Sequence, residues 1–334
     1  MGRLRPQRYP FRNIVVVVDR RPPLTVSDEK IELRRDLERT DDRMRNDVLE
    51  ALYELGLNVQ LYGHPSELAS NAEQHSTDLV LSLFGGEISR NRVALVPAIC
   101  EAYGLRCVGP DVYGAIIAQD KEVSKNLALQ AGLLTPWHRI IRSREQAPLV
   151  RQYPLPYVVK PLLEGTSIGI SQRNFIRTAD DGEPLVEELL EAFHQPVIVE
   201  GFIPGWEASY NVIETSSGIE WSYADIHVDG DENFFDTHLF DAEEKVLRRL
   251  QRSVRSIDEH LSDSDRAALD KFVGLMKPLG YARIDGKHHE GRFHFLEVTP
   301  DAWIGKAGAF AAGFMNRGWS YPEIIEALMM SAFV

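Results

Sequence analysis

A run of apolar, β-branched residues near the N-terminus constrains the fold more than any other feature of the chain. Ile14 to Val18 contains no polar residue, which is typical of a strand buried on both faces of a sheet. Helix-like and strand-like segments then alternate, at 48–55, 59–62, 79–84, 93–103 and 107–108. This alternation predicts a parallel sheet covered by helices. No Gly-x-Gly-x-x-Gly and no Gly-x-x-x-x-Gly-Lys follows the first strand, which disfavours a nicotinamide-binding fold and a P-loop.

Beyond Pro136 the pattern changes to short strands with antiparallel character, and a chain of 334 residues is long enough for two or three lobes. Candidate strands lie at 138–141, 157–160, 196–200, 209–213 and 221–226, and a pair at 281–287 and 292–298 is predicted to form a hairpin. Helical patterns lie at 111–132, 183–193, 248–276 and 321–332. Segments 21–43 and 229–244 are polar or without period, and we predict loops there.

The composition excludes several classes of protein. Lys plus Arg is 37 and Asp plus Glu is 50, and a balance of −13 disfavours a protein that grips nucleic acid or anionic lipid. The two cysteines, Cys100 and Cys107, lack the spacing of zinc or redox motifs. No apolar run approaches the roughly 20 residues of a membrane-spanning helix, and residues 1–18 lack the pattern of a secretory signal. We therefore expect a cytoplasmic protein with small-molecule partners.

The first motif that carries chemistry is a strand ending in Lys160, followed by the glycine- and hydroxyl-containing segment 164–170. A lysine at the end of an apolar strand buries its stem and presents its ammonium group at the loop. Glycines and hydroxyls allow backbone and side-chain donors to close over phosphate oxygens. The alternative is an exposed lysine before an ordinary glycine turn.

The second motif is the apolar run 197–199, followed by Glu200, Gly201, Phe202 and Ile203, with Glu207 close behind. The backbone of such a segment can bond an adenine ring, and a carboxylate such as Glu207 can accept hydrogen bonds from ribose hydroxyls. Glu200 could equally be a solvated charge at the end of a strand.

The third motif joins Arg283 and Asp285 on one predicted strand to Glu297 on the next. Two carboxylates on neighbouring strands repel each other unless a cation lies between them. Mg²⁺ that carries phosphate oxygens suits such a pair, and Arg283 shares a face with Asp285. The alternative is a structural Arg–Asp pair.

These motifs, preceded by Asp120-Lys121 and followed by Gly318-x-Ser320-Tyr321, resemble the ATP-grasp superfamily and, within it, the D-alanine–D-alanine ligase family. The resemblance implies an α/β and α+β ATP-grasp fold with an N-terminal parallel-sheet domain, divided at 1–110, 111–208 and 209–334. It implies an ATP-dependent carboxylate–amine ligase that uses ATP and Mg²⁺ (or Mn²⁺), forms an acyl phosphate and acts as a homodimer.

The resemblance also assigns roles to residues. Arg283 steadies the transferred phosphoryl group under the loop hydroxyls of Thr166 and Ser167, and Asp285, Glu297 and Thr299 hold metal. The nucleotide-binding residues it implies are Lys121, Lys160, Glu200, Gly201, Phe202, Ile203, Glu207 and Leu296.

The departures from the family pattern concern the metal strand and the amino-acid side. Thr299 stands where the family has asparagine, with Asp301 as a candidate compensating ligand. The family's Pro-Gly-Met-Thr segment is replaced by 300–308, which contains Trp303 and Lys306. Candidate substrate residues are Glu87, His238, Trp303 and Lys306, with Arg90 or Arg92 as candidates for an acidic substrate group.

Three hypotheses follow from this sequence. The first is a ligase that joins an amino acid or related carboxylate to an amine and is not specific for D-alanine. The second is a true D-alanine–D-alanine ligase. The third, motivated by Thr299, is an ATP-binding relative with impaired catalysis and a binding or regulatory role.

Overall fold

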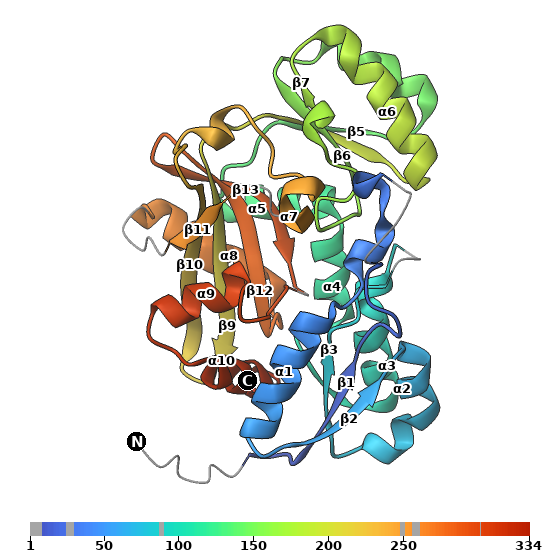
Figure 1. Ribbon diagram of the computed structural model, residues 1–334, viewed down its shortest axis with the longest axis vertical. Helices are drawn as coiled ribbons and strands as arrows, with labels where there is room; N and C mark the ends of the chain where they lie inside the picture. The colour runs from blue at the N-terminus through green and yellow to red at the C-terminus, as the bar shows by residue number, and fades with distance from the viewer. Residues whose placement is uncertain (1–8, 25–29, 87–89, 248–250, 256–260, 301) are drawn as a thin grey trace.

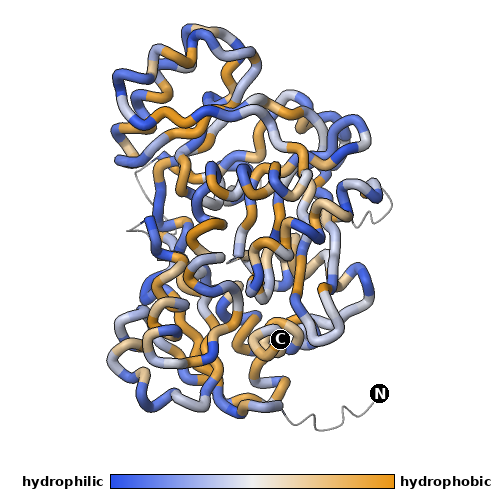
Figure 2. Tube along the Cα trace, turned by 180° about the vertical axis from the view of Figure 1, so that it is seen from behind, coloured by the Kyte–Doolittle hydropathy of each residue, from blue (hydrophilic) through white to orange (hydrophobic). Residues whose placement is uncertain are grey.

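The computed structural model describes residues 9–24, 30–86, 90–247, 251–255, 261–300 and 302–334. They form one parallel and two antiparallel sheets with helices around them (Figure 1), which confirms the predicted combination of α/β and α+β architecture. Apolar residues gather along the strands and the inner helix faces (Figure 2). In the described part of the chain no helix is long and apolar enough to cross a membrane.

The N-terminal sheet is parallel, and the predicted apolar run forms one of its two inner strands. Its strand order is β2-β1-β3-β4, with bounds β1 Asn13–Val17, β2 Asn58–Tyr62, β3 Leu79–Ser82 and β4 Arg106–Val108. Ile14 and Val16 face α1 (Asp42–Glu54), whereas Val15 and Val17 face α2 (Pro65–Asn71) and α3 (Leu95–Tyr103). Both faces are therefore apolar, as the continuous run requires.

The central lobe is an antiparallel sheet with its own core. Its order is β5-β8-β6-β7, with bounds β5 His138–Ile141, β6 Tyr157–Pro161, β7 Phe175–Ile176 and β8 Val197–Gly201. Helix α6 (Ala179–Phe193) and the 3₁₀ turn η5 (Arg144–Gln152) cover one face. Lys160 and Glu200 lie on the opposite face of β6 and β8, which is turned away from this core.

The C-terminal lobe is a five-stranded antiparallel sheet. Its order is β11-β10-β9-β12-β13, with bounds β9 Trp206–Thr215, β10 Gly218–Val228, β11 Arg252–Arg255, β12 Tyr281–His289 and β13 Arg292–Thr299. Helices α5 (Lys121–Ala131) and α8 (Asp263–Met276) pack on one face, and α9 (Ala309–Asn316) lies against β9 and β10 on the other. The predicted hairpin β12–β13 is confirmed, and its turn uses positive φ angles at Glu290 and Gly291.

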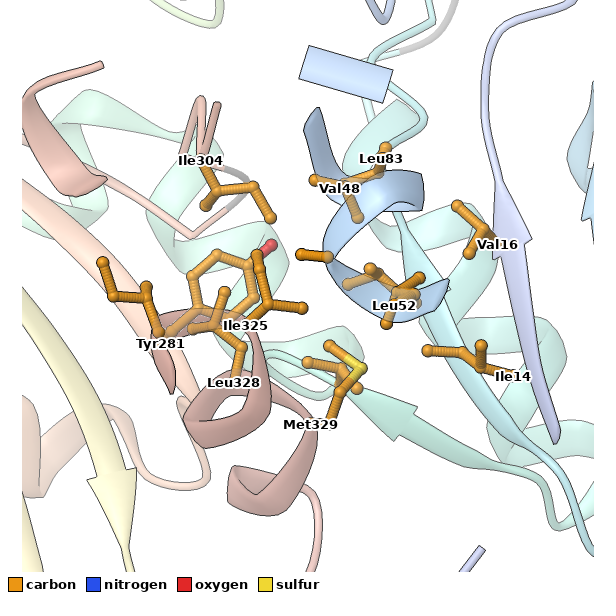
Figure 3. Close-up of a cluster of buried hydrophobic side chains, with 14 of the residues drawn as sticks. Ile14, Val16, Val48, Leu52, Leu83, Tyr281, Ile304, Ile325, Leu328 and Met329 are labelled. Carbon is orange, nitrogen blue, oxygen red and sulfur yellow. The ribbon is translucent and has the colours of Figure 1, made fainter. Parts of the chain in front are cut away.

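The N-terminal sheet and the C-terminal lobe share one hydrophobic core. Helix α10 (Tyr321–Ser331) begins at a capping box formed by Ser320 and Glu323 and packs between them. Figure 3 shows Leu328 and Met329 of α10 beside Leu52 of α1 and Tyr281 of β12. The two parts are therefore joined by buried apolar contacts, whereas the central lobe has a separate core.

Several local predictions are corrected by the structure. In segment 248–276, predicted to be mostly helical, the helix α8 is preceded by a short strand, β11, which pairs with β10. The predicted loop 229–244 contains the 3₁₀ turn η7 (Phe234–Asp236) and the start of α7 (Ala242–Leu247). The predicted loop 21–43 contains the turns η1 (Ile31–Leu33) and η2 (Arg35–Glu38). The helical stretch 111–132 divides into α4 (Val112–Gln119) and α5, because the side chain of Asp120 caps a new helix. The boundaries at 110 and 208 remain predictions.

Candidate active site

A cleft of about 1140 Å³ opens among the three sheets and collects most of the predicted site residues. Its lining includes Lys121, Lys160, Thr166, Ser167, Glu200, Gly201, Phe202, Ile203, Glu207, Arg283, Asp285, Leu296, Glu297, Thr299 and Trp303. These residues come from segments far apart in the sequence, and the fold brings the three motifs together in one cleft.

Besides Arg90, which is exposed and does not line the cleft, two candidate substrate residues do not reach it. The ammonium group of Lys306 lies 2.6 Å from Glu50 Oε2 on α1, outside the cleft lining. His238 is exposed and stacks on Phe234 with ring centroids 4.4 Å apart. The structure thus differs from the prediction for both, because each side chain is drawn to a neighbour on the surface. Glu87, like Asp301, lies outside the described residues.

Glu200 is the centre of a buried charge cluster at the end of β8. Its side chain is 2% exposed and forms ion pairs with Lys160 and, at 2.8 Å, with Lys125. Burial alone raises the pKa of Glu200, but the two lysine charges outweigh it and lower the pKa to about 2. Glu200 is therefore not a solvated charge, and its carboxylate holds Lys160 in the cleft wall.

Lys121 links the loop after β6 to the predicted metal strand. Its ammonium group donates to the backbone carbonyl of Glu164 and lies 3.3 Å from Glu297 Oε2. Burial raises the pKa of Glu297, yet the surrounding lysines, Lys121 foremost, lower it to about 2. Glu297 is thus an anion at every physiological pH, on the floor of a cleft that is otherwise rich in lysine.

Asp285 lies directly opposite Glu297 in the register of β12 and β13. Arg283 Nε donates to both carboxylate oxygens of Asp285, at 2.8 and 2.9 Å. The hydroxyl of Ser209 donates to Asp285 Oδ1 at 2.6 Å, and that of Thr299 donates to Oδ2 at 3.4 Å. The Arg–Asp pair that the sequence left open as an alternative therefore exists, and it faces the cleft beside Glu297.

The loop between β6 and β7 has an unusual backbone at its two hydroxyl residues. Thr166 and Ser167 adopt positive φ angles of 48° and 58°, a region that non-glycine residues rarely occupy. Such strain persists where the surroundings fix the chain, and it is common at ligand-binding sites. Ser167 Oγ donates to the carbonyl of Phe240 at 2.9 Å, which ties the loop to the segment before α7.

Helix α7 adds a cation that the sequence did not reveal. Lys245 lines the cleft, and its ammonium group lies 5.2 Å from the ring centroid of Phe240. Burial lowers the pKa of Lys245, and the neighbouring charges of Glu297 and Asp285 oppose that effect. The predicted loop 229–244 thus ends in a helix that brings positive charge to the carboxylates.

The opposite end of the cleft is built around Glu207 and Phe202. Lys287 Nζ lies 3.1 Å from Glu207 Oε1 and donates to the carbonyl of Gly205 at 3.0 Å. Phe202 stacks on Phe175 at 4.1 Å between ring centroids. This part of the cleft therefore combines an aromatic wall, the backbone of β8 and one carboxylate.

Trp303 forms the wall of the cleft nearest to α1. Its indole Nε1 donates to Asp41 Oδ2 at 2.6 Å, and Asp41 also caps α1. A Cβ at Gly305 or Gly308 would lie 2.4 Å from the indole ring, so glycine at both positions lets the loop wrap closely around it. Trp303 is thus fixed in place between the C-terminal lobe and the N-terminal sheet.

The comparisons with known proteins agree with this arrangement. A family model described as the D-ala D-ala ligase C-terminus matches residues 133–330, more than half of the chain. The chain belongs to the D-alanine–D-alanine ligase family. Members of this family are ATP-dependent ligases of the ATP-grasp type, which confirms the class of enzyme predicted from the motifs.

Individual members of the family share low sequence identity with this chain, but the match extends over nearly their whole length. The chain is 25% identical over 304 residues to a D-alanine–D-alanine ligase of Thermotoga maritima, covering 86% of this chain and 90% of that protein. It is 26% identical over 291 residues to the Glaesserella parasuis enzyme, covering 84% and 89%.

Solved structures of the family show the same fold. The D-alanine–D-alanine ligase of Bacillus anthracis complexed with ATP superposes with a TM-score of 0.69 at 16% identity, over 96% of this chain and 97% of that one. The VanG D-Ala:D-Ser ligase of Enterococcus faecalis gives a TM-score of 0.71 at 16% identity, over 96% and 99%. The ATP-grasp fold predicted from the motifs is thereby confirmed.

Sequence reasoning missed several charged or polar residues of the site, namely Glu38, Lys125, Ser209, Lys245 and Lys287. Lys287 and Ser209 lie at period-two positions from Asp285 and Glu207, respectively, so the strand pattern could have found them. Arg92, considered as a contact for an acidic substrate, is instead buried, 3.2 Å from Glu164 Oε2. Glu38 and Lys245 carried no signal, since both lie in segments predicted to be loops or outside a motif.

Proposed function

We propose that this ligase joins an amino acid or a related carboxylate to an amine through an acyl phosphate, and that its substrates differ from D-alanine. The observation that carries the proposal is the cleft itself, with lysines along one wall, the pair Asp285 and Glu297 opposite, and Trp303 at the end where substrates would enter. The nucleotide end of this cleft fits the family pattern, and the substrate end departs from it.

The lysines supply the charge that a triphosphate requires. Lys160 and Lys121 project from the ends of β6 and α5 into the same space. Glu200 keeps Lys160 protonated, because its charge raises the lysine pKa against the effect of burial. We propose that these two ammonium groups hold phosphate oxygens, while the backbone of 201–203 and the carboxylate of Glu207 hold adenine and ribose.

The donor set at the metal strand fits Mg²⁺ or Mn²⁺. Two carboxylates in register, with the Thr299 hydroxyl beside them, offer the oxygen ligands that these ions prefer when phosphate oxygens complete the shell. The described residues hold no group of three or more acidic, histidine or cysteine side chains suited to a metal, so these ligands depend on nucleotide for completion. When bound, the ion would supply positive charge against the phosphate oxygens.

The reaction has two chemical steps, in which Arg283 and the loop with Thr166 and Ser167 have separate roles. The substrate carboxylate oxygen bonds to the terminal phosphorus as the bond to the ADP oxygen breaks. The neutral amine nitrogen then bonds to the acyl carbon as the bond from that carbon to the phosphate oxygen breaks, so phosphate leaves and takes up the proton that the nitrogen loses. Arg283, held at a fixed distance by Asp285, is positioned to steady the charge on the transferred group. The loop bearing Thr166 and Ser167 closes over the phosphates and excludes water from the acyl phosphate.

The substrate end supports a specificity other than D-alanine. Trp303 and the two glycines around it stand where the family has Pro-Gly-Met-Thr, and the indole is fixed by Asp41. A bulky side chain at this position reshapes the space available to the acceptor. The D-alanine and D-serine named for the relatives are therefore controls in the experiment rather than the expected substrates.

The test is a screen for phosphate release. The protein is incubated with MgATP and pools of D-amino acids, L-amino acids and hydroxy acids, with D-alanine alone and with D-alanine plus D-serine. We expect release with a pool other than D-alanine alone, and ligated product by mass spectrometry. Turnover that requires only D-alanine would replace the proposal with the second hypothesis, and ATP binding without turnover in every pool would favour the third.

We also propose that the enzyme works in the cytoplasm as a homodimer, as the family resemblance implies. Analytical ultracentrifugation of the full chain at micromolar concentration would measure the assembly state. A monomer at all concentrations would contradict that part of the proposal.

A further inference from the structure

The segment Lys30–Thr40, here named the strap, runs from the N-terminal sheet to the central lobe. Figure 1 shows it as the blue stretch ahead of α1 that reaches toward β6. At the N-terminal sheet, Thr40 donates its backbone N–H to Asp19 Oδ2 at 2.8 Å, and Asp19 also accepts from the backbone of Gly85 at 3.0 Å. A Cβ at Gly85 would lie 1.6 Å from the carbonyl oxygen of Glu38, so only glycine lets the strap pass.

The other end of the strap is anchored to the central lobe. Leu33 and Leu37 pack against the core of that lobe. Arg35 Nη2 donates to the carbonyl of Phe193 at 2.8 Å. Between these anchors a buried ion pair of Arg34 and Asp36, at 2.7 Å, stiffens the strap. The strap is therefore a fixed connection between two lobes rather than a loose surface loop.

The strap holds both ends of the loop that carries Thr166 and Ser167. Glu38 Oε1 accepts a hydrogen bond from the backbone N–H of Gly165 at 2.9 Å, and the backbone carbonyl of Glu32 accepts from Gly169 at 2.5 Å. Arg92 lies 3.7 Å from Glu38 and 3.2 Å from Glu164, so its charge binds the strap and the loop together. Hydrogen bonds to a charged acceptor are stronger than neutral ones.

We propose that the strap positions the phosphate-covering loop, and that Glu38 is its positioning residue. Glu38 acts through the backbone of Gly165 and contacts no predicted substrate atom. The inference rests on the proposed role of this loop over the phosphates. It implies that the N-terminal sheet, which forms one wall of the cleft, sets the loop in the conformation that receives ATP.

The test compares three variants of the full chain. Glu38→Ala removes the acceptor and the charge, whereas Glu38→Gln keeps an oxygen acceptor for Gly165 but loses the charge that faces Arg92. Glu32→Ala is the matched control, because it removes one carboxylate from the same strap yet keeps the backbone carbonyl that holds Gly169. Two quantities are measured, namely amide hydrogen exchange of the loop peptide 164–170 and the KM for ATP with the substrate pool that the screen identifies.

We expect Glu38→Ala to speed exchange of the loop amides and raise the KM for ATP, each by about tenfold, as for loss of a charged hydrogen bond. Glu38→Gln should give about a threefold change, and Glu32→Ala should match the wild type. Equal exchange and equal KM in Glu38→Ala and Glu32→Ala would overturn the inference. If Glu38→Ala does not fold, wild-type values in Glu38→Gln would overturn it instead.

Failure of the proposed function gives a different result. A wild-type protein that binds no ATP would reject the nucleotide site, whereas the exchange of the loop amides would still report whether Glu38 holds the loop. A wild type that turns over normally, with unchanged exchange in both Glu38 variants, would reject the strap alone.

Discussion

Glu200 shows at a single residue how buried charges in this site compensate one another. Its carboxylate lies between Lys125, which is fully buried, and Lys160, which faces the cleft. A buried carboxylate alone is costly, and so are two buried lysines without a counter-charge. The three together are stable because each charge compensates another, and the arrangement presents one cation to the ligand space.

Glu200→Gln should therefore destabilise the protein by about 3–5 kcal/mol at neutral pH, since it leaves buried lysines without their anion. The pKa of Glu200 falls from its ordinary 4.5 to about 2 on folding, so this stabilisation is complete above about pH 4.5 and is lost as the pH falls toward 2. Urea unfolding of both proteins across pH 2–7 measures the difference. A difference that does not shrink below pH 4.5 would contradict the assignment.

Glu297→Gln tests the proposed metal strand. We expect turnover to fall by at least about a hundredfold, because a charged ligand at the transferring phosphate is lost, while the protein still folds. Glu290→Gln is the matched control, since it makes the same change on the same hairpin at an exposed turn. Initial rates and far-UV circular dichroism of both variants decide the matter, and equal turnover would remove Glu297 from the site.

At the scale of elements, the loop between β6 and β7 depends on Gly169 for two separate reasons. Its φ angle is 79°, and a Cβ there would lie 2.3 Å from Pro161 Cγ. The first requirement concerns the backbone alone, whereas the second sets the distance between the loop and the end of β6. Gly318, with a φ angle of 91° and open space around it, has only the first requirement.

Gly169→Ala should therefore lower stability and also raise the KM for ATP several-fold, because the loop must move away from Pro161. Gly318→Ala should lower stability by about 1 kcal/mol through backbone strain and leave the KM unchanged. Thermal unfolding and ATP kinetics of the pair separate the two effects. A KM shift of equal size in both variants would show that the loop is not specifically affected.

Local hydrophobic periodicity predicted many helices and strands correctly. It did not predict the elements whose structure depends on contacts between distant segments of the chain. The apolar run of β1 and the hairpin β12–β13 follow from local periodicity, so Asp285 and Glu297 could be paired from sequence. Strand β11 pairs with β10 across a sequence gap that no local pattern marks. The turns of the strap form because Leu33 and Leu37 pack on another lobe. Lys125 was seen as part of a helix, but its partner Glu200 lies on a different sheet.

At the scale of the whole molecule, the core around α10 joins the first and last parts of the chain. Leu328 is fully buried between α1 and the C-terminal sheet (Figure 3). Leu328→Ala should lower the free energy of unfolding by about 2–5 kcal/mol, as a cavity in a shared core does. Urea unfolding followed by near-UV and far-UV signals measures it. We expect one coincident transition, and separate transitions would show that the two parts unfold independently.

This shared core also determines which lobe of the enzyme can move relative to the others. The N-terminal sheet and the C-terminal lobe cannot part without exposing α10, so opening must come from the central lobe. The chain enters that lobe near residues 132–137 and leaves it near 202–205, and these two crossings are the natural hinges. The strap also connects the N-terminal sheet to the central lobe. Nucleotide exchange would therefore require the contacts between the strap and the central lobe to break in every catalytic cycle.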